Sequence, residues 1–233
     1  MSLLELRRVS KRYGRGMRER VALKNVSLQV DAGELVSVWG RRRSGRSTLL
    51  RVAGGVEAPD EGMVCFDGRE LSGRCGEMLG HSIGYCRTTF QASEGEAVLD
   101  HVMVGQYAHG ISPSLAEVRA RAALERAGAQ RCAARRPGEL DCDEIVRVAI
   151  ARALALDPRL LLVDEPTIGV DLLARDGILL LLQSLAREGT AVLMSTGEAT
   201  GLSGARALTL SDGELHGAPA RELAAVVPLR RPA

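Results

Sequence analysis

Two patterns of apolar residues alternate along this chain. Short continuous apolar runs are typical of buried strands, and longer segments whose apolar residues recur every three or four positions are typical of helices. Buried strands are predicted at 34–39, 160–164 and 190–196. The run LLLVD at 160–164 is so apolar that we expect it to be covered on both faces. Helices are predicted beside these strands, at 47–54, 147–156 and 178–188. Strands that alternate with helices indicate a three-layer α/β core.

The segments outside this alternation have patterns of their own. Strands are predicted at 3–10 and 21–30, joined by a Gly- and Arg-rich turn, and at 63–71, which contains an Asp-Gly turn. The segment 207–217 reads as a hairpin that turns at Asp212-Gly213. These strands add a β-rich part to the α/β core.

A block of helical spacing interrupts the core between about residues 99 and 138. It includes a helix with a Ser-Pro start at Ser112 and a stop at Gly128. We therefore predict a single domain over 1–233, with a helical lobe inserted at about 88–146 and a loose tail at 218–233.

The composition narrows the class of protein. A hydrophobic content of 45% and a charged content of 26% are ordinary for a packed, soluble chain. The net charge of +2 gives no global attraction for nucleic acid, which is not an expected partner. No signal peptide is recognisable at the start, and the richest apolar run, 178–182, is too short to cross a bilayer. Five scattered cysteines favour reduced thiols in a cytoplasmic protein, and we assign no metal to cysteine or histidine.

Residues 39–48, WGRRRSGRST, have the outline of a phosphate-binding loop, Gly-x-x-x-x-Gly-Lys-[Ser/Thr], with arginine at the lysine position. Glycines let backbone N–H groups turn toward phosphate oxygens, and the helix that follows directs its positive end at them. We expect the loop to bind an anion. Its candidate residues are Gly40, Arg41, Arg42, Arg43, Ser44, Gly45, Arg46, Ser47 and Thr48.

Residues 147–171, RVAIARALALDPRLLLVDEPTIGVD, closely resemble the ATP-binding subunits of ABC transporters. The order of features in this segment is that of the family: a helix, an Asp-Pro break, four apolar residues, the acidic pair Asp164-Glu165 and then Asp171. Asp171 lies where the family's dimer-contact loop carries Asp. The resemblance covers about residues 2–217. It implies a P-loop NTPase core of the ABC ATPase type, with an antiparallel β subdomain and an inserted helical lobe.

The resemblance also implies roles for single residues. Tyr13 stands where the family has an aromatic side chain that stacks on adenine. Ser47 would bind Mg²⁺ and Thr48 a phosphate, while Asp164 would hold Mg²⁺ through water. Glu165 would orient and polarise the attacking water. ATP and Mg²⁺ are the implied cofactors.

Four of the family's chemical motifs are altered here. Arg46 replaces the loop lysine, and its planar guanidinium keeps the charge but is bulkier than an ammonium. Thr88 stands at the glutamine of the family's Gln loop, and Gln91 would replace it only in a remodelled loop. Gly197 occupies the place of the switch histidine. The family's signature Leu-Ser-Gly-Gly-Gln reads LDCDE at 140–144.

The altered signature bears most directly on hydrolysis. In this family two domains meet head to tail, and the signature of one faces the γ-phosphate held by the other. Asp141, Asp143 and Glu144 would place carboxylates there. At about 5 Å and an effective dielectric near 20, each pair of like charges would cost roughly 3 kcal/mol. Asp141 and Glu144 also have the spacing of a capping box for a helix that begins near Ile145.

Two functions follow as expectations. The first is an ATP-binding subunit that docks on a membrane permease at the inner face of the cell membrane. It would pair with a second ABC ATP-binding domain as a homodimer or a heterodimer, and hydrolyse ATP weakly or not at all. The second is a non-catalytic scaffold or regulatory module whose arginine-rich loop binds another anion or an acidic protein. An ABC-type nucleic-acid factor is disfavoured, since this sequence shows neither two such domains nor a long coiled-coil insertion.

Overall fold

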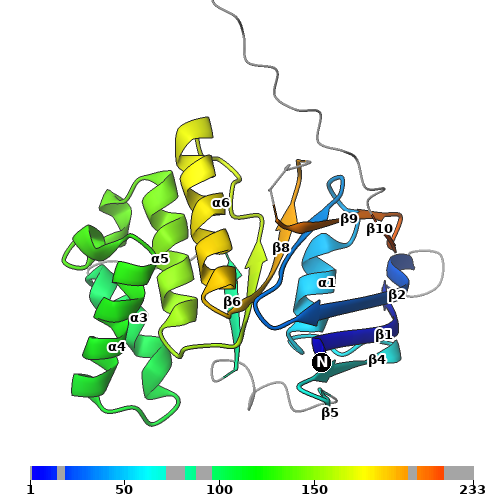
Figure 1. Ribbon diagram of the computed structural model, residues 1–233, viewed down its shortest axis with the longest axis horizontal. Coiled ribbons are helices and arrows are strands. Elements are labelled where there is room, and N and C mark those ends of the chain that lie inside the picture. The colour runs from blue at the N-terminus through cyan, green and yellow to red at the C-terminus, as the bar shows by residue number, and fades with distance from the viewer. Residues whose placement is uncertain (1, 15–18, 72–81, 88–95, 199–203, 218–233) are drawn as a thin grey trace, which may run out of the picture.

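A six-stranded sheet forms the centre of the computed structural model (Figure 1). Its strand order is β10-β9-β3-β8-β7-β6; the strands from β9 to β6 run parallel, and β10 pairs antiparallel with β9. The structure describes residues 2–14, 19–71, 82–87, 96–198 and 204–217. The strands of this sheet are β3 (Leu35–Trp39), β6 (Ile83–Arg87), β7 (Leu160–Asp164), β8 (Ala191–Thr196), β9 (Arg206–Ser211) and β10 (Glu214–Gly217).

A second, antiparallel sheet has the order β2-β1-β4-β5. Helix α1 (Arg46–Ala53) packs into one core with strands of both sheets, since its apolar side chains join theirs in a single cluster. The predicted strand at 63–71 is divided into two by the turn at Asp67-Gly68, where both residues have positive φ. The strands are β1 (Ser2–Tyr13), β2 (Arg20–Asp31), β4 (Glu61–Phe66) and β5 (Arg69–Glu70).

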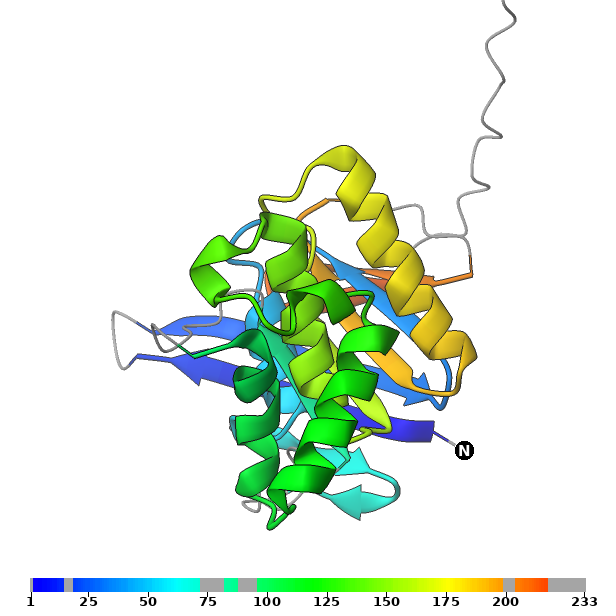
Figure 2. The same cartoon turned by 90° about the vertical axis from the view of Figure 1, so that its left-hand side faces the viewer.

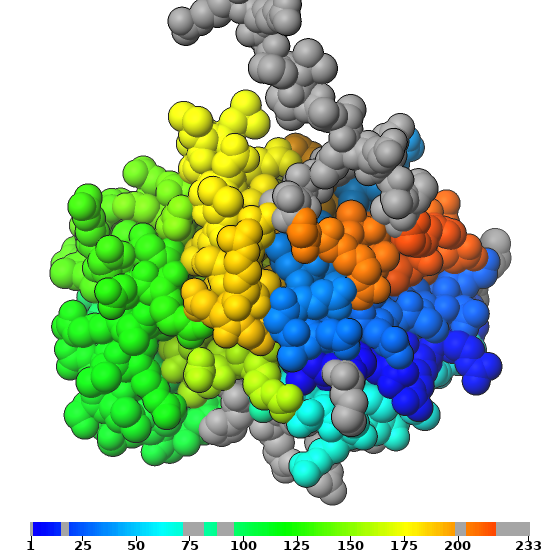
Figure 3. All heavy atoms as spheres, viewed as in Figure 1, coloured from blue at the N-terminus to red at the C-terminus, as the bar shows by residue number. Residues whose placement is uncertain are grey.

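Helices cover the other face of the central sheet. Helices α5 and α6 lie against the sheet, and α3 and α4 pack outside α5 (Figures 1 and 2). The space-filling view shows these helices, green to yellow, packed against the β-rich part (Figure 3). In the described residues, no helix combines the length and hydropathy that a membrane span requires. The helices are α3 (Val98–Tyr107), α4 (Pro113–Arg126), α5 (Cys142–Leu154) and α6 (Leu172–Arg187), with 3₁₀ turns at Gln130–Cys132 and Pro137–Glu139.

Strand β7 is buried on both faces, as its apolar run predicts. Leu160 and Leu162 join the core around α1, whereas Leu161 and Val163 join the core beneath α5 and α6. Successive side chains of a strand point to opposite faces, so only a strand without polar positions can be covered twice. The α/β fold with an antiparallel β subdomain and a helical lobe is therefore confirmed.

Two helices begin earlier than their apolar spacing predicts. Helix α5 begins at Cys142 rather than 147, and α6 begins at Leu172 rather than 178. Their first turns are held by capping contacts instead of core packing: Asp171 accepts hydrogen bonds from the backbone N–H groups of Leu173 and Ala174. The start of the predicted lobe, at 88, and the predicted tail, 218–233, lie outside the described residues.

The double burial of β7 predicts a large cost for removing one of its side chains. Leu162 is fully buried, so Leu162→Ala is expected to lower the free energy of unfolding by about 3 kcal/mol. Leu180 on α6 is 62% exposed, so Leu180→Ala is the control and is expected to change the free energy of unfolding by less than about 0.5 kcal/mol. Urea denaturation measures both, and equal losses would contradict the two-sided core.

Candidate functional site

The carboxyl ends of the parallel strands place the candidate site. Trp39 at the end of β3 pairs in register with Thr196 of β8, and Asp164 at the end of β7 pairs with Ser195. Polar side chains that follow these strands therefore meet at one edge of the sheet. In open α/β sheets, ligands bind at this edge.

The loop between β3 and α1 is shaped by two residues with positive φ. Arg43 has a φ of 70° and Gly45 a φ of 107°. A Cβ at Gly45 would lie 2.1 Å from the carbonyl oxygen of Ala22, so only glycine fits there. Gly45 also accepts the first helical hydrogen bond of α1, from the Leu49 N–H at 2.8 Å. The loop and the helix N-terminus together favour an anion.

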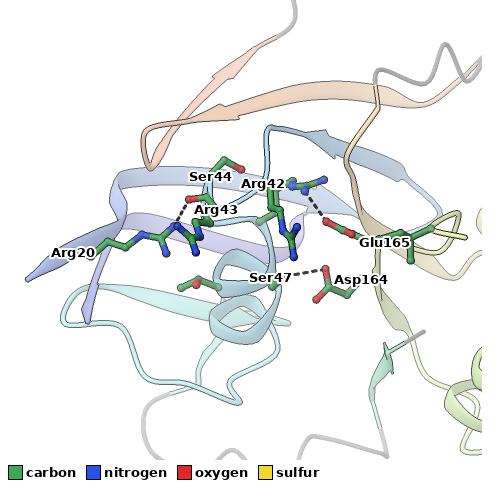
Figure 4. Close-up of a pocket in the computed structure, with 11 residues that line it drawn as sticks. Arg20, Arg42, Arg43, Ser44, Ser47, Asp164 and Glu165 are labelled. Atoms are coloured by element: carbon green, nitrogen blue, oxygen red, sulfur yellow. Dashed lines mark hydrogen bonds and ion pairs between the residues drawn. The ribbon is translucent and has the colours of Figure 1, made fainter. Parts of the chain in front are cut away.

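A cavity of about 410 Å³ opens over this loop (Figure 4). Four arginines and two carboxylates contribute to its wall, so its charge suits a polyanion. Nine of the predicted site residues lie together here: Arg42, Arg43, Ser44, Gly45, Arg46, Ser47, Thr48, Asp164 and Glu165. The wall also contains Arg20 and Ile168.

Ser47 and Asp164 bring two oxygen atoms together. The Ser47 hydroxyl donates a hydrogen bond to Asp164 Oδ1 at 3.2 Å (Figure 4). Ser195 donates to the same oxygen at 2.6 Å. Hydroxyl and carboxylate oxygens are the ligands that Mg²⁺ prefers, so this pair fits the implied ion. Burial and the negative charge of Asp164 raise the pKa of nearby Tyr85 to about 12, so its hydroxyl is no base at neutral pH.

Arg46 and Glu165 form an ion pair across the cavity, with 2.6 Å between Nη2 and Oε1. The Arg46 side chain is only 6% exposed, and its Nη1 has no hydrogen-bond partner among the described residues. Glu165 has a φ of 51°, and its N–H donates to the Ser195 hydroxyl at 3.0 Å. The backbone of Glu165 is thus anchored to β8 while its carboxylate reaches the loop.

Gly197 lies against the guanidinium of Arg46. A Cβ at position 197 would lie 3.5 Å from Nη1, so a side chain there would contact the arginine. This distance is an ordinary van der Waals contact, so Arg46 and position 197 are direct neighbours.

Comparison with known proteins connects this geometry to a family. A family model described as "ABC transporter" matches residues 23–168. The lipoprotein-releasing system ATP-binding protein LolD of Myxococcus xanthus (strain DK1622) is 36% identical over 221 residues, covering 92% of this chain and 99% of that protein. The cell division ATP-binding protein FtsE of Escherichia coli (strain K12) is 35% identical over 225 residues, covering 94% and 100%. The chain belongs to the ABC transporter family.

Within this family, the chain is the ATP-binding subunit. The dimeric structure of MJ0796, a bacterial ABC transporter cassette, matches it with a TM-score of 0.82 at 32% identity, covering 91% of this chain and 96% of that one. The same cassette in a dimeric post-hydrolysis state, bound to ADP and Pi, matches with a TM-score of 0.81 at 30% identity, covering 91% and 96%.

The LDCDE segment of this ABC subunit opens helix α5. Glu144 accepts hydrogen bonds from the Asp141 N–H at 2.9 Å and from Arg135 Nη1 at 2.7 and 2.8 Å. The glutamate half of the predicted capping box is therefore present. Asp143 lies 3.7 Å from Arg147 Nε. Two of the three carboxylates therefore have arginine partners. Their repulsion of a phosphate would be smaller than the roughly 3 kcal/mol that each unpaired carboxylate would cost.

Three other predicted site residues lie outside the cavity wall. Tyr13 is half-buried, and its hydroxyl bonds to Glu57 and, at 3.4 Å, to Thr48, which ties the ring to α1. Stacking of Tyr13 on adenine stays a prediction.

Gly40 donates its N–H to the Thr196 carbonyl at 3.3 Å, and Arg41 is exposed. The positions aligned with the Gln loop, Thr88 and Gln91, lie outside the described residues.

Sequence reasoning missed Arg20, Ile168 and Ser195. Arg20 begins β2 and donates to the carbonyl oxygen of Arg43 (Figure 4). Ser195 is fully buried within an apolar strand, and that polar exception was the one available signal. Arg20 reaches the loop only through the pairing of β1 with β2, and local sequence carries no sign of it.

The contacts of Glu144 predict an acid-dependent contribution to stability. The Asp141 N–H and the Arg135 guanidinium lower the pKa of Glu144 from its usual value near 4.5. The stabilisation is therefore complete above pH 4.5 and is lost as the pH falls through the lower, folded-state pKa. Glu144→Gln is expected to cost about 1 kcal/mol at pH 7, since solvent screens this partly exposed pair, and less as the pH falls.

Thermal unfolding across this pH range measures the effect. Glu125→Gln, at an exposed site on α4, is the control and should leave the pH dependence unchanged. A constant difference between wild type and Glu144→Gln at all pH values would contradict the assignment.

Proposed function

We propose that this ABC subunit binds ATP with Mg²⁺, docks on a membrane permease and pairs with a second ABC ATP-binding domain, but hydrolyses ATP weakly or not at all. The observation that carries the proposal is the ion pair between Arg46 and Glu165. Glu165 is the carboxylate expected to polarise the attacking water. Here a buried guanidinium is bonded to that carboxylate.

The cavity supports the binding half of the proposal. Arg20, Arg42 and Arg43 provide cations at its wall, and the helix N-terminus adds its partial charge. Ser47 and Asp164 would hold Mg²⁺, which when bound neutralises charge on the transferring phosphoryl group. The relative MJ0796, whose structure matches along most of this chain, is described with ADP and Pi bound.

The same cavity argues against efficient hydrolysis. For Glu165 to act on water, its carboxylate must leave Arg46 or share it with a phosphate. Gly197 supplies no side chain at the position of the family's switch histidine, and the guanidinium lies beside it. Residues 140–144 carry carboxylates where the family has serine and glycines. Each change removes stabilisation that a developing phosphate charge requires.

A scaffold or regulatory module is the second candidate function. Arg41 supports it, because this exposed arginine lies outside the cavity wall and is free to meet an anion other than a bound nucleotide. The two candidate functions differ in nucleotide binding, which the first requires and the second does not.

The first test compares wild type with Glu165→Gln. We expect labelled ATP to bind in the presence of Mg²⁺ at millimolar concentration, and phosphate release to be slow and equal in both proteins. Brisk, vanadate-sensitive hydrolysis that Glu165→Gln abolishes would overturn the loss of turnover. Failure to bind ATP, ADP or GTP would overturn the binding half and favour the scaffold.

The second test addresses the cavity arginines. Arg42→Ala and Arg43→Ala should each weaken ATP binding by about tenfold, because each removes a charged partner of the phosphates. Arg119→Ala, at an exposed site on α4, is the matched control and should bind ATP like wild type. Equilibrium dialysis measures the affinities, and unchanged affinity in the loop variants would place the nucleotide elsewhere.

A further inference from the structure

Four polar side chains connect strand β1 to helix α1. Tyr13 is the last residue of β1, Thr48 and Arg51 belong to α1, and Glu57 follows this helix. The Tyr13 hydroxyl is bonded to Glu57 and lies 3.1 Å from Arg51 Nη2 and 3.4 Å from Thr48 Oγ1. Thr48 also lines the cavity. These four residues, the Tyr13 cluster, therefore reach the cavity through Thr48.

The Tyr13 cluster is largely shielded from water. Thr48 is 6% exposed, and the side chains of Arg51 and Glu57 are 24% and 28% exposed. Arg51 Nε lies 2.6 Å from Glu57 Oε1 without the alignment of a hydrogen bond, so the two form an ion pair. Lys11 Nζ lies over the Tyr13 ring, 5.9 Å from its centre. Polar contacts in such surroundings hold one another in place more firmly than contacts in open solvent.

The chemistry of the donors and acceptors fixes the direction of the hydrogen bonds in the cluster. A guanidinium only donates, and a carboxylate only accepts. Arg51 Nη2 has two N–H groups, and it donates to the oxygens of Tyr13 and Thr48 at 3.1 and 3.3 Å. The single proton of the Tyr13 phenol is donated to the Glu57 carboxylate. Each of these three bonds therefore has one possible direction.

This arrangement leaves the hydroxyl proton of Thr48 without a good acceptor among the described residues. The Thr48 oxygen accepts from Arg51, so its proton must be donated elsewhere. The acceptor within reach is the Tyr13 oxygen at 3.4 Å, which is long compared with the usual distance of about 2.8 Å between hydroxyl groups. A phosphate oxygen in the cavity would be a charged and therefore stronger acceptor.

We propose that the Tyr13 cluster positions Thr48, by holding its oxygen as an acceptor so that its proton is available to the phosphate chain of a bound nucleotide. Tyr13 is then a positioning residue that acts through its hydroxyl, whatever base its ring stacks on. The inference rests on the proposed function, since it takes phosphate as the ligand of the cavity.

Tyr13→Phe tests the role of the hydroxyl, because it removes that group and keeps the aromatic ring. The affinity for ATP with Mg²⁺ should fall by about fivefold, the effect of about one hydrogen bond. Stacking alone predicts an unchanged affinity, since phenylalanine offers the same kind of ring face to a base. Equilibrium dialysis measures the affinity, and ATP binding that is unchanged in Tyr13→Phe would overturn the inference.

A double-mutant cycle with Thr48→Val tests whether Tyr13 acts through Thr48. Thr48→Val replaces the hydroxyl with a methyl group of similar size. In the Thr48→Val background, Tyr13→Phe should change ATP affinity by less than about twofold, because the group that Tyr13 positions is already absent. A loss of affinity through local unfolding would persist in this background. A further loss of about fivefold there would therefore overturn the inference.

Tyr107→Phe is the matched control, since Tyr107 is 43% exposed on α3 and the change is the same. This variant should bind ATP like wild type, and an equal loss of affinity would show that the effect is not specific to Tyr13 and would overturn the assignment. Failure of the wild-type protein to bind ATP would overturn the proposed function and this inference together. Wild-type binding that Tyr13→Phe leaves unchanged counts against this inference alone.

Discussion

The arrangement of this protein depends on parallel strands that are covered on both faces. Leu160–Val163 send alternate side chains into two cores, so no polar group can be placed along the strand itself. The polar residue of β7, Asp164, is at the end of the strand, and parallel pairing brings the ends of β3, β7 and β8 to one edge. For that reason Asp164, Ser195 and the loop between β3 and α1 meet at this edge.

Arginine at position 46 links several departures from the family pattern. Its guanidinium reaches Glu165 and lies 3.5 Å from the place that a Cβ at 197 would take. Only Nη2 is bonded to Glu165, while Nη1 has no hydrogen-bond partner among the described residues. Positions 46 and 197 are therefore neighbours, and the ion pair of Arg46 changes the surroundings of the carboxylate that hydrolysis would use.

The arginines of the loop between β3 and α1 lie in two settings. Arg42, Arg43 and Arg46 line the cavity, whereas Arg41 is exposed outside its wall. Cations that line a cavity raise the local concentration of anions there, which suits the phosphate chain that we propose as the ligand.

The sequence alone determined the features that local pattern encodes: the buried strands, the hairpin at Asp212-Gly213, the glycine loop and the acidic pair Asp164-Glu165. These depend on periodicity and on conformational preferences that act over a few residues. Tertiary structure decided which distant groups meet. The bond from Ser195 to Asp164, the approach of Arg20 to the loop and the ion pair of Arg46 join residues far apart in the chain. Strand register creates those contacts, and it is set by the packing of whole layers rather than by any short segment.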